Sequence, residues 1–152
     1  MNASMVSFST REIAPNTTIA QAPALVGILL SSLVFEYETK SLRTDKYSAF
    51  TVAGASIGVV APAFKAWHET FWENLAASIQ LHNIKQVIVM NHRDCGAAKI
   101  AYGDAAVATP AAETETHKKA LLTFKAELAK RQPKLGSQLG LMALDGKVEL
   151  FS

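Results

Sequence analysis

QVIVMNHRDCGAAKIAYG, residues 86–103, is the stretch on which the prediction of the fold rests. Residues 86–90 are apolar and rich in β-branched side chains, which is typical of a buried parallel strand. A polar turn follows at residues 91–96, and residues 97–102 are good helix formers. In open α/β sheets, ligands and catalytic groups gather beyond the carboxyl ends of the strands, so we expect the functional site in this turn.

The turn contains His92 and, three positions later, Cys95, which is the only cysteine of the chain. An imidazole nitrogen and a thiolate are both ligands that zinc accepts, and a helix beginning behind Cys95 favours the thiolate. The alternative is a buried free cysteine beside a surface histidine, which is the more common meaning of an isolated pair of this kind. Two ligands do not make a zinc site, so the prediction depends on the rest of the chain.

Composition limits the class of protein. The chain has 152 residues, 49% of them hydrophobic, and a net charge of +2, which predicts one folded domain with a substantial core. Its 15 basic residues are scattered, so nucleic acid is not an expected partner. The longest apolar run, residues 22–35, is too short to span a bilayer and lacks the features of a signal peptide. A single cysteine excludes an internal disulfide, and we expect a soluble cytoplasmic protein with no membrane partner.

The first third of the chain predicts an arm and two strands. Residues 1–23 are rich in Ser, Thr, Asn and Ala and read as an N-terminal arm, whereas residues 24–152 are predicted to form a single α/β domain. Residues 24–30 predict a central strand, followed by a turn and a short helix over residues 31–43. A second strand is expected at residues 50–53.

That strand leads into a loop of small residues, GASIG, at residues 54–58. Its glycines permit a positive φ and a close approach of the backbone to other groups. The loop does not match the G-x-G-x-x-G pattern, so a dinucleotide site is not expected.

Pro62 begins the clearest helix, which is predicted to extend to residue 79. Its apolar residues recur at spacings of three and four and predict one buried face, made of Phe64, Trp67, Phe71, Leu75 and Ile79. Trp72 lies beside this stripe and is a candidate for extending it into a subunit interface. His68 and His82 are candidates for a third metal ligand, although a surface histidine is the more ordinary role for each.

The last third predicts a loop, a long helix and a hairpin. Residues 104–112 read as a loop, and residues 113–131 read as a helix with acidic residues in its first turn, basic residues in its last turn and Pro133 just beyond it. Residues 139–144 and 147–151 predict two strands joined by an Asp-Gly turn. The order of elements predicts an α/β sheet with covering helices.

Between about residues 24 and 151 the chain resembles the β-class carbonic anhydrases. The segment HRDCGA, residues 92–97, is similar to the H-x-x-C-G segment of that family, and ALVGILL, the Ala53-Gly54 loop and LMALDGKVELF resemble other parts of it. The resemblance implies a mostly parallel central sheet with flanking helices. It also implies a zinc-dependent lyase (carbonate dehydratase) that hydrates CO2 reversibly to bicarbonate.

The resemblance assigns roles to individual residues. His92 and Cys95 would be metal ligands, the backbones of Gly54 and Gly96 would shape the pocket, and Arg93 and Asp94 would belong to the catalytic surroundings. Zinc with an open coordination position lowers the pKa of a bound water to about 7, which provides hydroxide at neutral pH.

The chain departs from the family at its first motif. The family takes one more cysteine ligand from a C-x-D-x-R motif at the end of the first strand, where the aspartate and the arginine pair and orient the zinc-bound water. The corresponding stretch here, ILLSSLV at residues 28–34, contains no Cys, Asp or Arg. We therefore expect zinc to be weakly bound or absent and CO2 hydration to be weak or lost.

Several explanations stay open. A substitute ligand such as Asp94, His68 or Glu36 would preserve an enzyme, whereas a chain that keeps the fold only for assembly or binding would be a pseudoenzyme. The first-strand segment could also be altered in this particular sequence. In a different class of function, Cys95 would be a reactive thiol with Arg93 nearby.

The resemblance also implies an oligomer. The family builds dimers in which the N-terminal arm and exposed helices pack across subunits. The arm at residues 1–23 and the aromatic helix at residues 64–79 fit such an arrangement, so we expect a homodimer or a higher oligomer.

Overall fold

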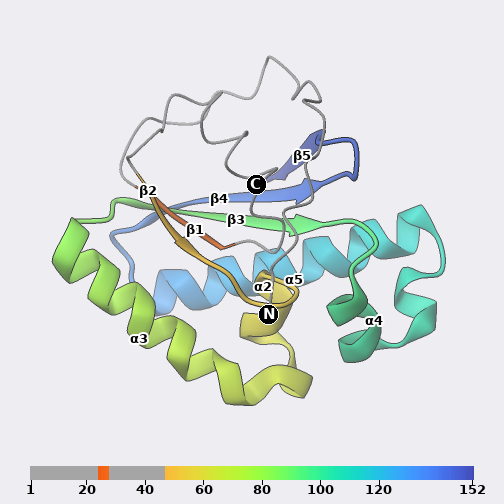
Figure 1. The fold of residues 1–152 in the computed structure, drawn as a ribbon, viewed down its shortest axis with the longest axis horizontal. Helices are drawn as coiled ribbons and strands as arrows, with labels where there is room; N and C mark the ends of the chain where they lie inside the picture. The colour runs from red at the N-terminus through yellow and green to blue at the C-terminus, as the bar shows by residue number, and fades with distance from the viewer. Residues whose placement is uncertain (1–23, 28–46) are drawn as a thin grey trace, which may run out of the picture.

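The computed structural model describes residues 24–27 and 47–152 (Figure 1). The predicted arm at residues 1–23, the end of the predicted first strand and the predicted helix at residues 31–43 lie outside the described residues. Glu36, a candidate ligand, lies outside them as well.

The centre of the described structure is one sheet with the strand order β2-β1-β3-β4-β5. β1 pairs in parallel with β2 and β3, and β3 pairs in parallel with β4, whereas β4 and β5 form an antiparallel hairpin. The central position of β3 explains its long apolar run, because its residues from 87 to 92 are all buried. The strands are β1 (Ala24–Gly27), β2 (Tyr47–Phe50), β3 (Gln86–His92), β4 (Gly136–Met142) and β5 (Val148–Phe151).

The long helices α3 and α5 and the short helix α2 cover one face of this sheet (Figure 1). The helical elements are α2 (Ser56–Val60), η1 (Pro62–Phe64), α3 (Lys65–His82), α4 (Gly96–Tyr102), η2 (Asp104–Val107) and α5 (Pro110–Arg131). The described residues thus form the predicted α/β architecture, in which helices pack on a sheet. None of the described helices is long and apolar enough to cross a membrane.

The main core lies between β3, β4 and these helices. Phe71 and Trp72 from α3 meet Phe124 from α5, and the Trp72 and Phe124 rings stack with centroids 5.5 Å apart. Val87 and Val89 of β3 point into the same cluster. Offset and edge-to-face aromatic contacts of this kind add to the stabilisation from buried area.

The predicted apolar stripe of α3 was wrong at its tryptophans. Trp72 is buried, at 7% exposure, so it belongs to the core of this chain, whereas Trp67 is 39% exposed and stacks on Phe64 with centroids 4.5 Å apart. The spacing rule treats all apolar residues alike. The helix is instead rotated so that Trp72 faces Phe124 and is covered. The guanidinium of Arg131 lies over the Trp72 ring, 4.9 Å from its centroid.

Some predicted boundaries also differ. α5 begins at Pro110, not at residue 113, because the Thr109 side chain accepts a hydrogen bond of 3.2 Å from the backbone of Ala112 and Pro110 occupies the first helical position. The predicted loop at residues 54–58 becomes helix α2 from Ser56 onward, and β2 ends at Phe50, where the second strand was expected to begin.

Candidate functional site

The predicted turn, residues 91–96, lies at the carboxyl end of β3 (Figure 1). Its predicted bounds were too wide, because Asn91 and His92 are the last residues of β3 and Gly96 is the first of α4. The backbone N–H of Arg93 still donates to the carbonyl of Met142 at 2.9 Å, so pairing with β4 continues to the base of the turn. Asp94 then adopts a left-handed conformation, with φ at 58°, and Cys95 is the N-cap of α4. Left-handed backbone is uncommon outside glycine, although aspartate tolerates it better than most residues.

Cys95 is buried beside His92, and its surroundings favour the thiolate. Burial alone raises the pKa of this thiol. Its interaction with the His92 ring and with the backbone N–H groups of Ala98 and Ala97 outweighs burial, and the pKa of Cys95 is lowered from its ordinary value. The sequence predicted this effect of the helix start.

One ring nitrogen of His92 is buried and, in the part of the chain that the structure describes, has only the Cys95 thiol to interact with. Its Nδ1 donates a hydrogen bond of 2.8 Å to the carbonyl of Arg93, which can only accept, so in the neutral ring the proton is on Nδ1. Nε2 is buried and makes no well-formed hydrogen bond. The interaction with Cys95 raises the pKa of His92, burial opposes this, and the Arg93 carbonyl reinforces it. This tautomer, with one nitrogen held by a carbonyl and the other free, is the one that metal-binding histidines use.

A carboxylate from α5 closes the turn from the other side. Glu113, which is 8% exposed, accepts a hydrogen bond of 2.6 Å from the backbone N–H of Asp94 and one of 3.1 Å from the Arg93 guanidinium. The Arg93 side chain is therefore bound to α5, and its Nη2 also donates to Thr114 at 2.7 Å. The Asp94 residue itself is exposed.

A buried polar bridge lies just before the turn. The Asn91 amide oxygen accepts hydrogen bonds from the backbone N–H of Ser56 at 3.1 Å and from its hydroxyl at 2.9 Å. With its oxygen so placed, Asn91 donates from Nδ2 to Nδ1 of His117 at 2.9 Å. His117 has 0% exposure, and burial lowers its pKa to about 4, so the ring is neutral at pH 7.

The glycine-rich loop after β2 approaches the start of α4, as predicted for Gly54. A Cβ on Gly54 would lie 3.0 Å from the Cβ of Ala97 and 3.1 Å from that of Ile57, and the residue has a φ of 77°. Gly96 differs, because a Cβ there would meet no atom within 4 Å. The positive φ and the limited space together favour glycine at position 54, whereas neither requires it at position 96.

Two other candidate ligands, His68 and His82, do not join His92 and Cys95 in a metal-binding group. His68 donates from Nε2 to the carbonyl of Ala61 at 3.0 Å, and His82 lies at the exposed end of α3. Within residues 24–27 and 47–152, no group of three or more His, Cys, Asp or Glu side chains is arranged to hold a metal ion. His92 and Cys95 thus fit zinc as two ligands, and the described part of the chain supplies no third.

Sequence reasoning missed the roles of four polar residues, namely Glu113, which bonds to the turn, and Ser56, Asn91 and His117, which form the bridge beside it. A signal was present, because Glu113 and His117 are four positions apart and so share one face of a helix. Buried polar residues on an otherwise apolar helix face indicate a specific partner.

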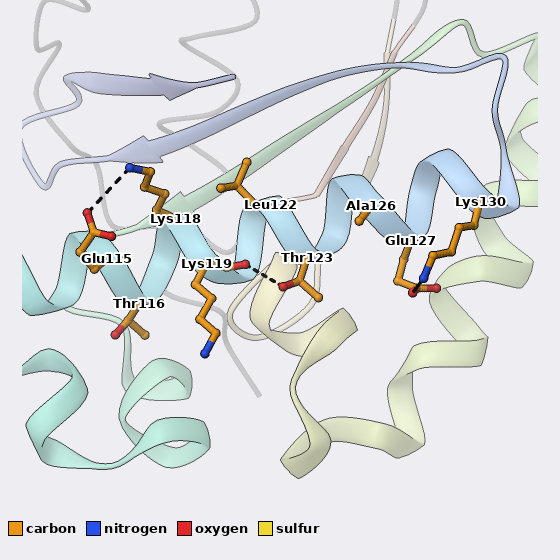
Figure 2. Close-up of a pocket in the computed structure, with 9 residues that line it drawn as sticks. All are labelled: Glu115, Thr116, Lys118, Lys119, Leu122, Thr123, Ala126, Glu127 and Lys130. Carbon is orange, nitrogen blue, oxygen red and sulfur yellow. Dashed lines mark hydrogen bonds and ion pairs between the residues drawn. The ribbon is translucent and has the colours of Figure 1, made fainter.

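A hollow on the outer face of α5 is separate from this site (Figure 2). Four of the charged side chains that line it form two pairs, Glu115 with Lys118 at 3.9 Å and Glu127 with Lys130 at 2.8 Å. None of the residues of the turn lines it.

Comparison by sequence finds relatives, but no family model matches the chain. Uncharacterized proteins of Rickettsia conorii and Rickettsia bellii are each 32% identical over 105 residues, which is 69% of this chain. The chain spans only 56% and 64% of the lengths of these two relatives.

Several solved structures are similar. The β-carbonic anhydrase CcaA matches with a TM-score of 0.61 and 14% identity, covering 87% of this chain and 80% of that protein. The β-carbonic anhydrase CafD of Aspergillus fumigatus matches with a TM-score of 0.54 and 10% identity, covering 93% and 95%. A carbonic anhydrase from Glaciozyma antarctica gives 0.53 and 14%, covering 91% and 88%. The chain therefore has a fold like that of the β-carbonic anhydrases.

Proposed function

We propose that this chain is a β-carbonic-anhydrase-like zinc protein whose metal ligands include His92 and Cys95, and whose CO2 hydration is weak or lost. The observation that carries the proposal is the bare, buried Nε2 of His92 next to the Cys95 thiol at the carboxyl end of β3. A nitrogen lone pair and a stabilised thiolate in one turn are a donor set that zinc accepts.

The remaining residues of the turn act on these two donors. The Arg93 carbonyl fixes the tautomer of His92, and the backbone N–H groups of Ala97 and Ala98 stabilise the Cys95 thiolate. In this proposal Gly54 and Gly96 border the pocket, and Arg93 and Asp94 are its catalytic surroundings. Zinc, when bound, would supply Lewis acidity and a more acidic water.

Weak or lost activity follows from the ligand count. Residues 28–34 lack the Cys, Asp and Arg of the first motif, and no third ligand is found within the described residues. A site with two protein ligands binds zinc less tightly and leaves the bound water without its orienting pair. The alternative is a pseudoenzyme that keeps the fold for assembly or binding, and in either case we propose a homodimer or higher oligomer.

A second candidate function rests on Cys95 alone. Because the His92 ring and backbone N–H groups lower the pKa of this thiol, Cys95 would react as a nucleophile or redox sensor without metal. For either candidate we propose a cytoplasmic location, because a single thiol stays reduced there.

Elemental analysis of zinc per chain, on protein purified without chelators, tests the proposal. We expect bound zinc in the wild type, loss of it in Cys95→Ala and in His92→Ala, and no change in His82→Ala, which removes an exposed histidine. CO2 hydration is then assayed on the zinc-loaded protein. A folded wild type without zinc would exclude the metal function, and rapid alkylation of Cys95 that chelators do not alter would favour the reactive thiol.

A further inference from the structure

The Glu113 carboxylate, in the first turn of α5, bonds both residues that lie between His92 and Cys95. Oε1 of Glu113 accepts the backbone N–H of Asp94 at 2.6 Å, and Oε2 accepts Nη1 of Arg93 at 3.1 Å. Hydrogen bonds to an ionised acceptor are stronger than neutral ones, and the partial burial of Glu113 limits competition from water. One side chain therefore holds both residues that lie between the two candidate ligands.

The Arg93 side chain extends this attachment. Its guanidinium also donates to the hydroxyl of Thr114 at 2.7 Å and to the carbonyl of Pro110 at 3.2 Å, and it lies 3.7 Å from Glu149 of β5. A planar guanidinium with several fixed donors suits such a junction better than a flexible ammonium would. The turn is thereby tied to α5 and to the hairpin.

The held conformation decides where Cys95 lies. Asp94 is in the left-handed region, with a φ of 58°, and its conformation sets the direction in which the chain leaves β3 to begin α4. Without the bond from its N–H to Glu113, the residue would gain by relaxing to an ordinary φ. Such relaxation would move the Cys95 thiol away from Nε2 of His92.

We propose that Glu113 is a positioning residue for the metal site, holding Asp94 and Arg93 so that His92 and Cys95 face one ion. The inference rests on the proposed zinc function and adds a residue outside the turn to it. Removing a residue that orients the ligands of a metal site typically lowers metal affinity by about 10- to 100-fold.

The test compares Glu113→Gln with Glu115→Gln in the full chain. The two substitutions remove the same charge from the same helix, but Glu115 is exposed and pairs only loosely with Lys118, at 3.9 Å. The amide that replaces the Glu113 carboxylate keeps its size and turns a donor toward either Arg93 or the Asp94 N–H. In competition with a chromophoric chelator, we expect zinc affinity to fall about tenfold or more in Glu113→Gln and to stay within about twofold of wild type in Glu115→Gln.

A second measurement on metal-free protein separates positioning from general stability. Hydrogen exchange of the Asp94 amide, followed by NMR, is expected to accelerate about tenfold or more in Glu113→Gln, while the amide of Val89 in the middle of β3 keeps its wild-type rate. If Glu113→Gln does not fold, Thr114→Val replaces it. This substitution removes one Arg93 partner and the hydroxyl's own bond to the Pro110 carbonyl but keeps the Glu113 carboxylate, so a smaller change in the same direction is expected.

The outcomes are distinct. Unchanged Asp94 exchange, or faster exchange with unchanged zinc affinity, would overturn the role of Glu113. Equal acceleration at Asp94 and Val89 would also overturn it, because it would mean general destabilisation. A wild type that takes up no zinc would refute the proposed function, and the local exchange at Asp94 would then still show whether Glu113 holds the turn.

Discussion

Nδ2 of Asn91 donates a hydrogen bond of 2.9 Å to Nδ1 of His117, and this bond joins the end of β3 to the middle of α5. The Asn91 oxygen accepts hydrogen bonds from Ser56, so a rotated amide would place its NH2 group against the backbone N–H of Ser56, and both groups are donors. Nδ1 of His117 must therefore accept, and a proton on this nitrogen would break the bridge. The hydrogen bond between Asn91 and His117 therefore forms only while the His117 ring is neutral.

The neutral state of His117 predicts how stability depends on pH. Burial lowers its pKa from 6.5 to about 4, so below pH 6.5 the unfolded chain takes up a proton that the folded chain refuses until about pH 4. The contribution of neutral His117 to the free energy of unfolding is fully present above pH 6.5 and is lost as the pH falls toward 4. The expected loss at pH 5 is about 2 kcal/mol. Urea unfolding of the wild type and His117→Gln at pH 7.5 and 5 measures this, and the variant should lack this part of the pH dependence. His82→Gln, which changes an exposed histidine, should behave as the wild type does.

Substitutions at the middle and at one end of the polar bridge should differ in their cost to the free energy of unfolding. Asn91→Leu leaves the Ser56 backbone N–H and the His117 ring without partners in a buried place, and we expect a loss of about 3 kcal/mol in the free energy of unfolding. Ser56→Ala removes only the hydroxyl, and the backbone N–H keeps its bond, so a loss of about 1 kcal/mol is expected. Equal losses in urea titrations would contradict this division.

Gly54 should be the least replaceable of the glycines in turns. Gly54→Ala adds backbone strain at a φ of 77° and a contact of 3.0 Å with the Ala97 Cβ, so we expect a loss of about 2 to 3 kcal/mol. Gly146→Ala, at a φ of 86° but with open space around it, should lose only about 1 to 2 kcal/mol, the cost of the backbone strain. Thermal unfolding of both variants compares them directly. If Gly54→Ala lost no more stability than Gly146→Ala, Ala97 of α4 would have moved away from the added methyl group without cost.

Substitutions of the two tryptophans of α3 should differ sharply in their effect on the free energy of unfolding. Trp72→Ala removes a buried ring stacked on Phe124, and we expect a loss of about 3 to 5 kcal/mol, or failure to fold. Trp67→Ala, at a side chain that is 39% exposed, should cost about 1 kcal/mol. Denaturant unfolding followed by far-UV circular dichroism measures both. If Trp67 proved the costlier of the two, the exposed face of α3 would have to be covered in solution.

His92 should control the chemistry of Cys95. The interaction with His92 lowers the pKa of the Cys95 thiol, so His92→Ala should move the midpoint of its alkylation rate to higher pH. The measurement uses iodoacetamide on metal-free protein between pH 6 and 10, with His82→Ala as the control. An unshifted midpoint would mean that the backbone N–H groups alone stabilise the thiolate.

Much of the site follows from short stretches of sequence. The predicted order of strand, turn and helix over residues 86–102 was confirmed, although the strand continues to His92 where a turn was predicted from residue 91. The assignment of His92 and Cys95 as metal ligands stays a prediction. Local rules succeed here because a strand's apolar run, a turn's polar residues and a helix's start depend on neighbours only a few positions away.

By itself, then, the sequence determined the strand β3, the helix α4 that follows it and most of the long helices α3 and α5, since their signals are local. The tertiary structure decided what surrounds that turn, because Glu113 reaches Asp94 across 19 positions and His117 reaches Asn91 across 26. Which tryptophan of α3 is buried was settled in the same way. The physical reason is that a helix's periodicity defines a face but not its partner. That partner is fixed only when α3 and α5 pack together beneath β3 and the ring of Trp72 meets Phe124.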